Sequence, residues 1–584
     1  MIRVVALRKA AIAGVAGAAA WEIVLRPAIL AGVPTFDIVK VLGTLAYPDG
    51  PALAWWSVGM AAHALVGICW AVFYAYFFWA RFEWPPPLQG LATAIVPALL
   101  ALGIVSPQMR LMHMQADEVQ LTRDLILPSL SAIEIGGLLA GHAIFGLVVG
   151  AMYVRPVGYR NGPARIRLAR TRQRPRKGAL GRPQGAGFIF AAGIEGSYPT
   201  IEQGRWRRDE MREMRHYEYW QRDFELAREM GITHLRCGPP LHLAFPGPGE
   251  FSWDLVDEPM AELEQFGPEP MVDLCHFGLP AWLGDFQNPE IAAALGDFAA
   301  AFAERYPWVR YYTPINEMYV TARMSALDGL WNEQRRDEGA FVTAVFNLVE
   351  ANTRMSEAIL AKRPDAIFIQ SESSEFYQAC CPEPSIELRA SFENERRFLA
   401  LDLLFAHEVS EEMLGYLRQH GREDDYRRYL KRDVPRRTVL GVDYYQWNEK
   451  LVDRDGQLRN LGELFGWSVI AGQYWQRYKK PMMHTETNYS DAAGAPRWLW
   501  RQWHNVQLLR RSGVPLIGFT WYSLTDQTDW EIGLRLPNGT VDPVGLFDLN
   551  RDPRAVALSY KHLIEMHRDQ PEYRECPALK ELLS

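Results

Sequence analysis

The chain has 584 residues and a formal net charge of −7 at pH 7, with 62 Lys and Arg against 69 Asp and Glu. This length allows one large domain and a smaller one. Residues 1–154 are dominated by Ala, Leu, Val, Gly and aromatic residues, whereas the rest has the mixed charge of an ordinary soluble domain. This uneven composition excludes a single soluble domain and indicates that the two parts meet different solvents.

Four apolar stretches in the first part are long enough, or nearly so, to cross a hydrocarbon core of about 30 Å. The third is short and contains Pro97, and the first contains Glu22 and Arg26. We predict that they form a four-span α-helical transmembrane domain over residues 1–154. The stretches cover residues 10–32, 53–80, 88–106 and 130–154.

The second and fourth stretches contain related sequences. HALVGICWAVFY begins at His63 and HAIFGLVVGAMY begins at His142, and His, Ala, Gly and Tyr recur at matching offsets. This internal repeat predicts two tandem helix pairs. Histidines at membrane depth can bind a metal or haem, or carry protons. The alternative, for Glu22 and Glu134 as well, is a hydrogen bond between packed helices.

A basic segment follows the fourth stretch. Residues 155–185 contain ten basic and no acidic residues. Such a cluster beside a span marks the cytoplasmic side and can lie on anionic lipid headgroups, so we expect a membrane-bound linker and no nucleic-acid partner. Arg3, Arg8 and Lys9 place the N-terminus on the same side, although a signal peptide is an alternative interpretation of this end. We predict an integral protein of the inner membrane, with its second part in the cytoplasm.

From residue 186 onward, short apolar runs alternate with helical stretches, which is typical of parallel strands and crossover helices. Glu317 in YYTPINEMY and Glu486 in PMMHTETNY end the fourth and seventh runs. Catalytic residues of a (β/α)8 barrel lie at the carboxyl ends of its strands, so these two carboxylates can converge on one glycosidic bond. We predict such a barrel over residues 186–584, with strands within 187–195, 232–238, 270–277, 310–317, 366–373, 438–447, 481–487 and 516–524.

Seven sequences then carry a resemblance. In chain order they are HYEYWQRDFELAREMGITHLR, DLCHFGLPAWL, TPINE, GVDYYQW, HTETN, SLTDQTDWEIG and VGLFDLNRDPRAVALSYKHLI. They resemble successive landmarks of glycoside hydrolase family 1, the β-glucosidase family, over about residues 187–568. The resemblance implies a retaining β-glycosidase that needs no metal or cofactor. It does not extend to the N-terminal region.

The resemblance also implies roles for individual residues. Glu317 matches the acid/base, which protonates the leaving oxygen and then activates water, and Glu486 matches the nucleophile of the glycosyl-enzyme. Arg236 matches the arginine that keeps the nucleophile charged, and Tyr445 matches the tyrosine that hydrogen-bonds it. Asn316 matches the asparagine that binds the sugar 2-hydroxyl. Each also has a structural alternative, such as a helix cap or a core ion pair.

The residues that would recognise the sugar depart from the family pattern. His276 and Trp530 match sugar-contacting residues, with core packing as the alternative. Asp529 replaces a glutamate that grips the outer hydroxyls and is one methylene shorter. These departures predict a glycone other than glucose, or a pocket for a larger glycoside. The other departures are Tyr522 for a tryptophan, Asp443 for an asparagine, Phe277-Gly278 for Trp-Asp, and the loss of a glutamine that Glu195 or Tyr198 could replace.

Together these features predict a membrane-anchored retaining β-glycosidase that acts on a carbohydrate, and specifically on a glycolipid or lipid-linked saccharide. Transfer of the sugar to an acceptor in place of water is an alternative within the same chemistry. A non-catalytic sugar-sensing barrel on a membrane module is an alternative from another class, as is a saccharide transporter formed by the spans. The retained carboxylates argue against the sensor, and the small number of spans argues against the transporter. The sequence leaves the oligomeric state open.

Overall fold

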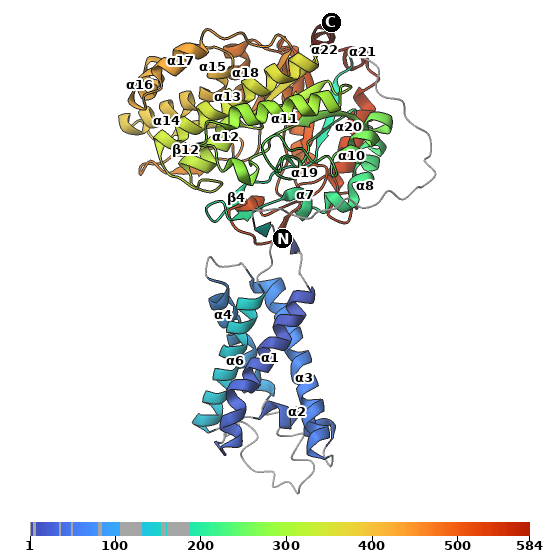
Figure 1. The fold of residues 1–584 in the computed structure, drawn as a ribbon, viewed down its shortest axis with the longest axis vertical. Coiled ribbons are helices and arrows are strands. Elements are labelled where there is room, and N and C mark those ends of the chain that lie inside the picture. The colour runs from blue at the N-terminus through green and yellow to red at the C-terminus, as the bar shows by residue number, and fades with distance from the viewer. Residues whose placement is uncertain are drawn as a thin grey trace. The chain divides into compact units, whose positions relative to one another are not determined.

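The computed structural model describes residues 2–3, 7–33, 37–47, 51–79, 85–105, 131–153, 159–160 and 186–584. These residues form two compact units, a helical unit within residues 2–156 and a barrel unit that takes up most of the chain from residue 157 onward. The basic segment 155–185 is described only at residues 159–160, so its role as a linker stays a prediction. Figure 1 shows both units, coloured along the chain.

The helical unit contains four stretches that are long and apolar enough to cross a membrane, namely Leu7–Leu30, Ala52–Phe78, Pro86–Gly103 and Ala132–Met152. They correspond to the four stretches predicted from the sequence. The short helix α2 beside α3 was not predicted. The helices are α1 (Leu7–Leu30), α2 (Ile38–Ala46), α3 (Ala52–Phe73) with its π-helical end η1 (Tyr74–Phe78), α4 (Pro86–Leu100) with η2 (Ala101–Val105), and α6 (Ala132–Met152); β1 is Ile2–Arg3.

Glycines bring the long helices into backbone contact, in the same way in both halves of the repeat. A Cβ atom added to Gly14 of α1 would lie 2.6 Å from the carbonyl oxygen of Gly67 of α3. A Cβ atom added to Gly90 of α4 would lie 2.0 Å from the carbonyl oxygen of Gly146 of α6. Gly67 and Gly146 each follow the repeated histidine by four residues. Small residues at such crossings let transmembrane helices pack closely, so the repeated glycines build two similar helix pairs.

A polar cluster lies within the helical unit. Arg26 pairs with Glu22 on its own helix, and its Nη1 lies 2.7 Å from Oδ2 of Asp37. His63 of α3 places Nδ1 3.5 Å from the Glu22 carboxylate. This contact joins α1 to α3, but it is not the hydrogen bond of the alternative interpretation, because Nδ1 of His63 has no hydrogen-bond partner among the described residues.

The second histidine of the repeat does not bridge helices in this way. His142 Nδ1 lies 2.8 Å from a carbonyl oxygen of its own helix, that of Leu138. His63 and His142 both meet the ring of Trp21 edge-on, with centroids 5.3 and 4.8 Å away. Glu134 forms a capping box with Ser131 at the start of α6.

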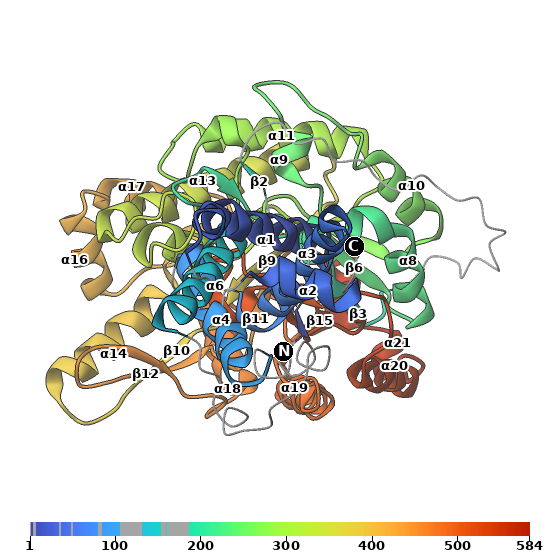
Figure 2. The same ribbon diagram turned by 90° about the horizontal axis from the view of Figure 1, so that it is seen from below.

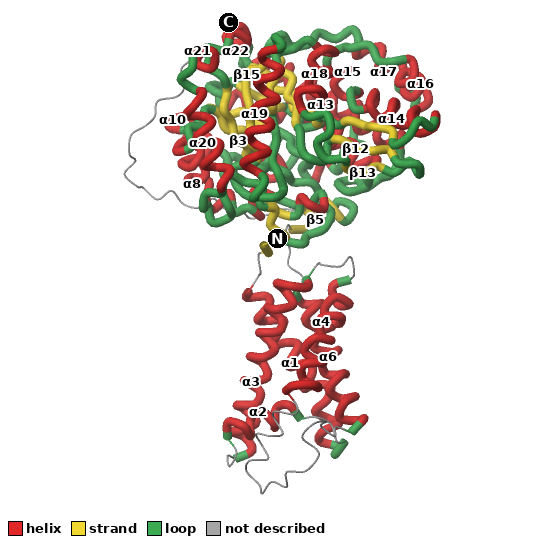
Figure 3. The backbone as a smooth tube through the Cα atoms, turned by 180° about the vertical axis from the view of Figure 1, so that it is seen from behind, coloured by secondary structure: helices red, strands yellow, loops and turns green. Residues whose placement is uncertain are grey.

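The barrel unit confirms the predicted eight parallel strands. They close in the order β11-β14-β15-β3-β6-β7-β8-β9, and β9 pairs with β11 to complete the ring. Helices lie around the strands in Figure 2 and cover them in Figure 3. The strands are β3 (Ile189–Gly193), β6 (His234–Cys237), β7 (Glu269–Asp273), β8 (Tyr311–Thr313), β9 (Ile367–Ser373), β11 (Thr438–Asp443), β14 (Met482–His484) and β15 (Leu516–Tyr522).

Further elements connect the strands or extend from them. The longer helices are α8 (His216–Glu229), α10 (Asp257–Phe266), α11 (Ile291–Arg305), α13 (Glu338–Lys362), α14 (Pro384–Arg396), α16 (Glu411–Gln419), α18 (Trp467–Tyr478), α19 (Ala495–Arg511) and α20 (Ala555–His567). The shorter helices are α7 (Glu210–Glu213), α9 (Leu241–Ala244), η3 (Ala281–Leu283), α12 (Met318–Ala322), η4 (Arg323–Leu327), α15 (Leu399–Leu404), α17 (Glu423–Tyr429), η5 (Trp530–Ile532), α21 (Pro571–Arg574) and α22 (Pro577–Leu583). The outer strands are β2 (Tyr159–Arg160), β4 (Thr200–Ile201), β5 (Trp206–Arg207), β10 (Phe376–Ala379), β12 (Glu449–Val452), β13 (Leu458–Asn460), β16 (Gln527–Thr528) and β17 (Thr540–Asp542).

Side chains alternate between the two faces of each barrel strand. In β3, Ile189 and Ala191 join a small inner core, whereas Phe190 and Ala192 join the large core that packs against the helices. Leu579 and Leu582 of α22 belong to the inner core. This packing leaves the carboxyl ends of the strands as the place where polar side chains gather.

Candidate active site

Three buried carboxylates meet at the carboxyl ends of β8, β11 and β14. Glu317 follows β8 and precedes α12 with a positive φ of 40°. Asp443 is the last residue of β11, and Glu486 lies two residues beyond β14. Carboxylate oxygens of all three residues lie within 4.8 Å of one another. The barrel thus brings together Glu317 and Glu486, which are about 170 residues apart in sequence.

Arg236 at the end of β6 compensates the charge of Glu486. This fully buried guanidinium donates through Nη1 to Oε1 of Glu486 and through Nη2 to Oδ1 of Asn316. Tyr445 donates its hydroxyl to Oε2 of Glu486 at 2.6 Å. Because both oxygens accept hydrogen bonds, the ionised form of Glu486 is stabilised.

Glu317 has a different environment. Among the described residues, no hydrogen bond reaches its carboxylate. Burial raises the pKa of Glu317 well above its ordinary value, and the nearby charges of Asp443 and Glu486 raise it further. A buried carboxyl group beside like charges holds its proton, whereas the carboxylate of Glu486 accepts hydrogen bonds from Arg236 and Tyr445.

Asp443 adds a third carboxyl group where the family pattern has an amide. Its Oδ2 accepts a 2.7 Å hydrogen bond from the Ser371 hydroxyl. Burial raises the pKa of Asp443 well above its ordinary value, and the Glu486 charge adds to this effect. Arg236 opposes the shift. The site therefore contains more carboxyl groups than it has cations to balance them.

His276 is linked to the same network through Asp273, which the sequence analysis missed. Asp273 Oδ2 accepts from Arg236 at 2.9 Å and lies 2.8 Å from His276 Nδ1. Burial disfavours the charged imidazole, but Asp273, Glu195 and Glu486 together outweigh it and raise the pKa of His276. The other ring nitrogen lies 3.0 Å from Nδ2 of Asn316. Asn316 is thus held between His276 and Arg236 and has no solvent exposure.

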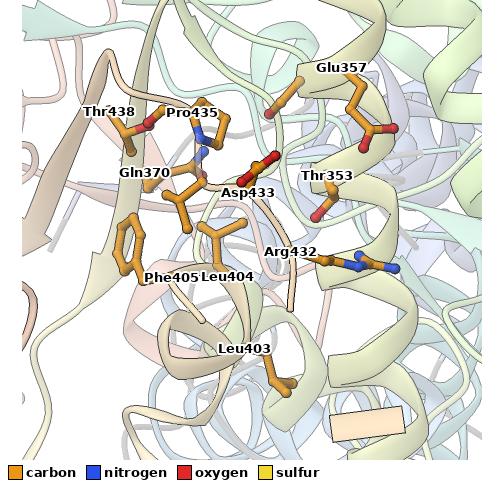
Figure 4. Close-up of a pocket in the computed structure, with 12 residues that line it drawn as sticks. Thr353, Glu357, Gln370, Leu403, Leu404, Phe405, Arg432, Asp433, Pro435 and Thr438 are labelled. Atoms are coloured by element: carbon orange, nitrogen blue, oxygen red, sulfur yellow. The ribbon is translucent and has the colours of Figure 1, made fainter. Parts of the chain in front are cut away.

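A cavity of about 330 Å³ opens over these groups. Glu317, Glu486, His276 and Tyr445 line it, as does Trp530. Residues beyond the sequence-predicted site also line it, among them Glu375, Asn448, Lys450, Asn488 and Gln527. Figure 4 shows a different cavity of about 40 Å³, beside α13 and the first residue of β11, Thr438. This smaller cavity lies at the opposite, amino-terminal end of the strand and is too small for a sugar ring.

Glu195 occupies the inner wall near His276. Its Oε1 lies 3.8 Å from His276 Nε2, and its Oε2 accepts from Gln527 at 2.9 Å. Burial raises its pKa. Tyr198, the other candidate to replace the missing glutamine, accepts the backbone N–H of His276 through its hydroxyl oxygen and does not line the cavity. Of the two candidates, Glu195 is therefore the one that a sugar can reach.

Asp529 and Trp530 have separate environments despite being neighbours. Asp529 is fully buried and accepts a 3.0 Å hydrogen bond from Arg208, whose guanidinium also binds Glu213. Asp529 is not among the residues that line the cavity, whereas Trp530 is. The structure thus gives Trp530 access to a ligand and gives Asp529 an ion pair in the wall behind it.

Known proteins resemble the barrel in sequence. The model of glycosyl hydrolase family 1 matches residues 200–456. Beta-glucosidase A of Thermotoga maritima is 24% identical over 355 residues, which cover 54% of this chain and 79% of that protein. The 1,4-beta-D-glucan glucohydrolase of Thermotoga neapolitana is 22% identical over 357 residues, which cover 54% and 83%.

Solved structures with a similar fold include a β-glucosidase from the same organism. A structure of the β-glucosidase from Thermotoga maritima in complex with deoxynojirimycin has a TM-score of 0.55 at 18% identity. The likeness covers 65% of this chain and 98% of that chain. The family match leaves out the helical unit. The barrel is similar to glycosyl hydrolase family 1 over residues 200–456, and this likeness supports a glycoside hydrolase of the retaining type.

Proposed function

We propose that Glu486 is the nucleophile and Glu317 the acid/base of a β-glycosidase that works through a glycosyl-enzyme. The separation of their carboxylates is the observation that carries this proposal. Oxygens of the two residues lie within 4.8 Å, close to the roughly 5–5.5 Å of retaining enzymes and below the roughly 6.5–9.5 Å that inverting enzymes need for a water. Direct attack by one carboxylate therefore fits the site.

The first step uses the different environments of the two carboxyl groups. Glu317 gives its proton to the glycosidic oxygen, and the bond between that oxygen and the anomeric carbon breaks. Glu486 forms the new bond to the anomeric carbon. Arg236 and Tyr445 hold Glu486 ionised and fixed in orientation, which lowers the cost of reaching the attacking geometry.

The second step reverses the roles. Glu317, now ionised, takes a proton from a water that attacks the anomeric carbon, and Glu486 leaves as a carboxylate. Asn316 would hold Arg236 and His276 in place, with its amide near the reacting sugar, while His276 and Trp530 would contact the glycone. Asp529 would not contact the sugar, and would act only through its hydrogen bond with Arg208 behind the cavity wall.

Trapping the glycosyl-enzyme tests this assignment. Dinitrophenyl 2-deoxy-2-fluoro β-glycosides of glucose, galactose, mannose and xylose should include one that adds one glycosyl unit to the intact protein. Peptide mapping should place it on Glu486. The Glu486→Gln protein should gain no mass, and a label on any other residue would overturn the assignment.

We also propose that the substrate is a glycolipid or lipid-linked saccharide and that the barrel lies on the cytoplasmic side. The four apolar helices support membrane association, and the basic segment 155–185 favours the cytoplasmic side. Leu461, Leu464 and Phe465 are exposed on the loop that follows Asn460 of the cavity wall. Exposed apolar residues that lie together favour contact with an apolar surface or with an acyl chain.

Alkyl β-glycosides test the lipid proposal. For the full-length protein in lipid vesicles, kcat/KM should rise from methyl to dodecyl aglycones and should be highest for a glycosylated diacylglycerol in the same vesicles. Equal rates across the series, or cleavage of soluble glycosides alone, would contradict the lipid proposal. A product in which the sugar is joined to an added alcohol would show transfer by the same site.

A further inference from the structure

The cavity over the catalytic carboxylates is lined by more acidic than basic side chains. Six acidic residues line it, and Lys450 is the one lysine or arginine among the described residues of its lining. Lys450 pairs with Glu375 at 2.5 Å, and the proposed function assigns Glu317 and Glu486 to the reaction. The remaining three acidic residues, which we call the acidic wall, are Glu195, Glu531 and Asp542.

Gln527 connects the members of the acidic wall. Its Nε2 donates to Oε2 of Glu195 at 2.9 Å. On β16, Gln527 lies directly opposite Asp542 of β17, and the side chains of such a pair lie on one face of the ladder. Asp542 Oδ2 accepts the backbone N–H of Trp530 at 2.7 Å. Glu195 and Asp542 therefore flank Gln527, next to the tryptophan expected to contact the glycone.

The acidic wall lacks a cation of its own. Among the described residues, no basic group pairs with Glu531 or Asp542. Glu195 has His276 at 3.8 Å, but Asp273 lies closer to that ring, at 2.8 Å. Burial raises the pKa of Glu195, and it raises the pKa of Asp542 to about 9, with the charge of Glu531 as the next cause. Buried carboxylates without a cation are costly, and a cationic ligand group would offset that cost.

Asn488 adds a buried acceptor that has no partner. It lines the cavity and is 2% exposed. Its Nδ2 donates to the carbonyl oxygen of Tyr522 at 2.7 Å, and its Oδ1 has no hydrogen-bond partner in the described part of the chain. Tyr522 ends β15, which pairs with β3, the strand that leads to Glu195. An ammonium group has three N–H donors, so it suits a cavity that offers both carboxylates and a free amide oxygen.

A chain of contacts indicates which part of the sugar faces the acidic wall. Arg236 donates to both Glu486 and Asn316. His276 lies 3.0 Å from Asn316, and Glu195 lies 3.8 Å beyond His276. Glu195 is thus separated from the nucleophile by three side chains. The acidic wall therefore faces ring carbons remote from the anomeric carbon, and not carbon 2 beside it.

We propose that the acidic wall binds a protonated amino group of the glycone, so that the enzyme cleaves β-glycosides of sugars with an amine on carbon 3, 4 or 6. This inference rests on the proposed function, because it names the sugar that the same site cleaves. The ammonium takes no part in the bonds that form and break. Glu195 acts as a specificity-determining residue, which selects the glycone by its charge.

Amino-substituted substrates test the acidic wall. 4-Nitrophenyl β-glucosides with an amine in place of the 3-, 4- or 6-hydroxyl are compared with the parent glucoside at about pH 6, where an aliphatic amine keeps its proton. At least one should exceed the parent in kcat/KM by about 10–100-fold, the gain expected for a hydrogen bond between charged groups. The 2-amino compound is the positional control. A parent glucoside that matches or exceeds all three amines, or a gain confined to the 2-amino compound, would overturn the proposal.

A variant of the acidic wall locates the effect. Glu195→Gln removes a charge at nearly constant size and should lower the ratio of kcat/KM for the preferred amine to that for the parent by about tenfold. The ratio compares two substrates on the same protein, so a partial loss of folded protein cancels. Asp491→Asn, at an exposed residue outside the cavity, is the matched control and should keep the ratio. An unchanged ratio in Glu195→Gln would show that the acidic wall does not select the amine.

Binding separates this inference from the proposed function, because it needs no turnover. Isothermal titration compares the methyl β-glycoside of the preferred amine with methyl β-glucoside. If no glycosyl-enzyme forms on Glu486 but the amine binds about tenfold more tightly, the proposed function fails and the acidic wall remains an ammonium site. If the glycosyl-enzyme forms and the amine binds no better than the neutral glucoside, the acidic wall is not such a site.

Discussion

Each unit of this protein holds an arginine between two carboxylates. In the helical unit, Arg26 pairs with Glu22 and Asp37. In the barrel, Arg236 pairs with Asp273 and Glu486. The two clusters look alike as ion pairs, and such a pair alone is weak evidence for either stability or function.

The surroundings of the two arginines differ. Oxygens of Glu317 and Asp443 lie within 4.8 Å of Glu486, and both carboxyl groups are buried with raised pKa values. In addition, a cavity opens over Glu317 and Glu486. Holding surplus carboxyl groups out of water is costly unless they keep their protons. Carboxyl groups with strongly shifted pKa values beside a cavity indicate a catalytic site. The Arg26 cluster, in contrast, joins helices.

The largest expected effect is the loss of the nucleophile. Glu486→Ala should lower kcat for every aryl β-glycoside by at least about 10⁴-fold, because no other group can form the covalent intermediate. Azide should restore turnover and give a glycosyl azide of inverted configuration. Asp491→Asn, an exposed carboxylate of the same loop, should retain activity. Normal turnover by Glu486→Ala without azide would show that the carboxylates of the barrel site do not carry out the reaction.

The effect of Glu317→Gln should depend on the leaving group. For a methyl aglycone, which needs protonation, kcat/KM should fall by about 10²–10⁴-fold. For a 2,4-dinitrophenyl aglycone, which leaves without a proton, the loss in kcat/KM should be much smaller. Steady-state rates for the two substrates decide between the roles. Equal losses would mean that Glu317 does not act as a general acid.

The pH dependence of kcat/KM in Asp443→Asn tests whether the surplus carboxyl group affects Glu317. The charge of Asp443 raises the pKa of Glu317, after burial as the main cause. The active form has protonated Glu317. Once Asp443 loses its own proton, its charge opposes the ionisation of Glu317. Asn at position 443 cannot ionise, so the variant should have a lower pKa for Glu317, and the alkaline limb of kcat/KM should move to lower pH. Asp491→Asn serves again as the control. An alkaline limb that stays in place would show that Asp443 does not tune Glu317.

The smallest effect on catalysis is expected in the helical unit. Arg26→Gln leaves Glu22 and Asp37 without their cation and should destabilise this unit by about 1–3 kcal/mol. Cleavage of a soluble aryl glycoside should not change. Thermal unfolding in detergent measures the loss of stability, with Arg8→Gln, at an exposed residue, as the control. A parallel loss of aryl glycosidase activity would mean that both arginines serve the reaction.

Local sequence was enough to predict the barrel. Seven of the eight strands fall within their predicted apolar runs, and β7 begins one residue before its run, at Glu269. Glu317 and Glu486 lie where two of these runs end. The four apolar stretches likewise indicated the long helices. The short helix α2 was missed because its nine residues lie between two spans and are too few to cross a membrane, which was the feature sought in this part of the sequence.

Long-range pairing was beyond the reach of the sequence. Asp529 accepts from Arg208, which lies 321 residues earlier, so its place in a motif did not reveal its partner. Asp273 joins Arg236 to His276, although its position three residues before His276 at a strand end was a usable signal. Asp443 was visible as a departure from the family pattern, but its approach to Glu317 and Glu486 depends on how three strands meet.

The stereochemistry of the first-formed product tests the central claim most directly. A β-glycoside that the protein cleaves is followed by proton NMR, fast enough to precede mutarotation. Two carboxylates within 4.8 Å that act through a glycosyl-enzyme predict that the β-anomer of the free sugar appears first. Initial release of the α-anomer would contradict the account, because it would require a water between Glu317 and Glu486.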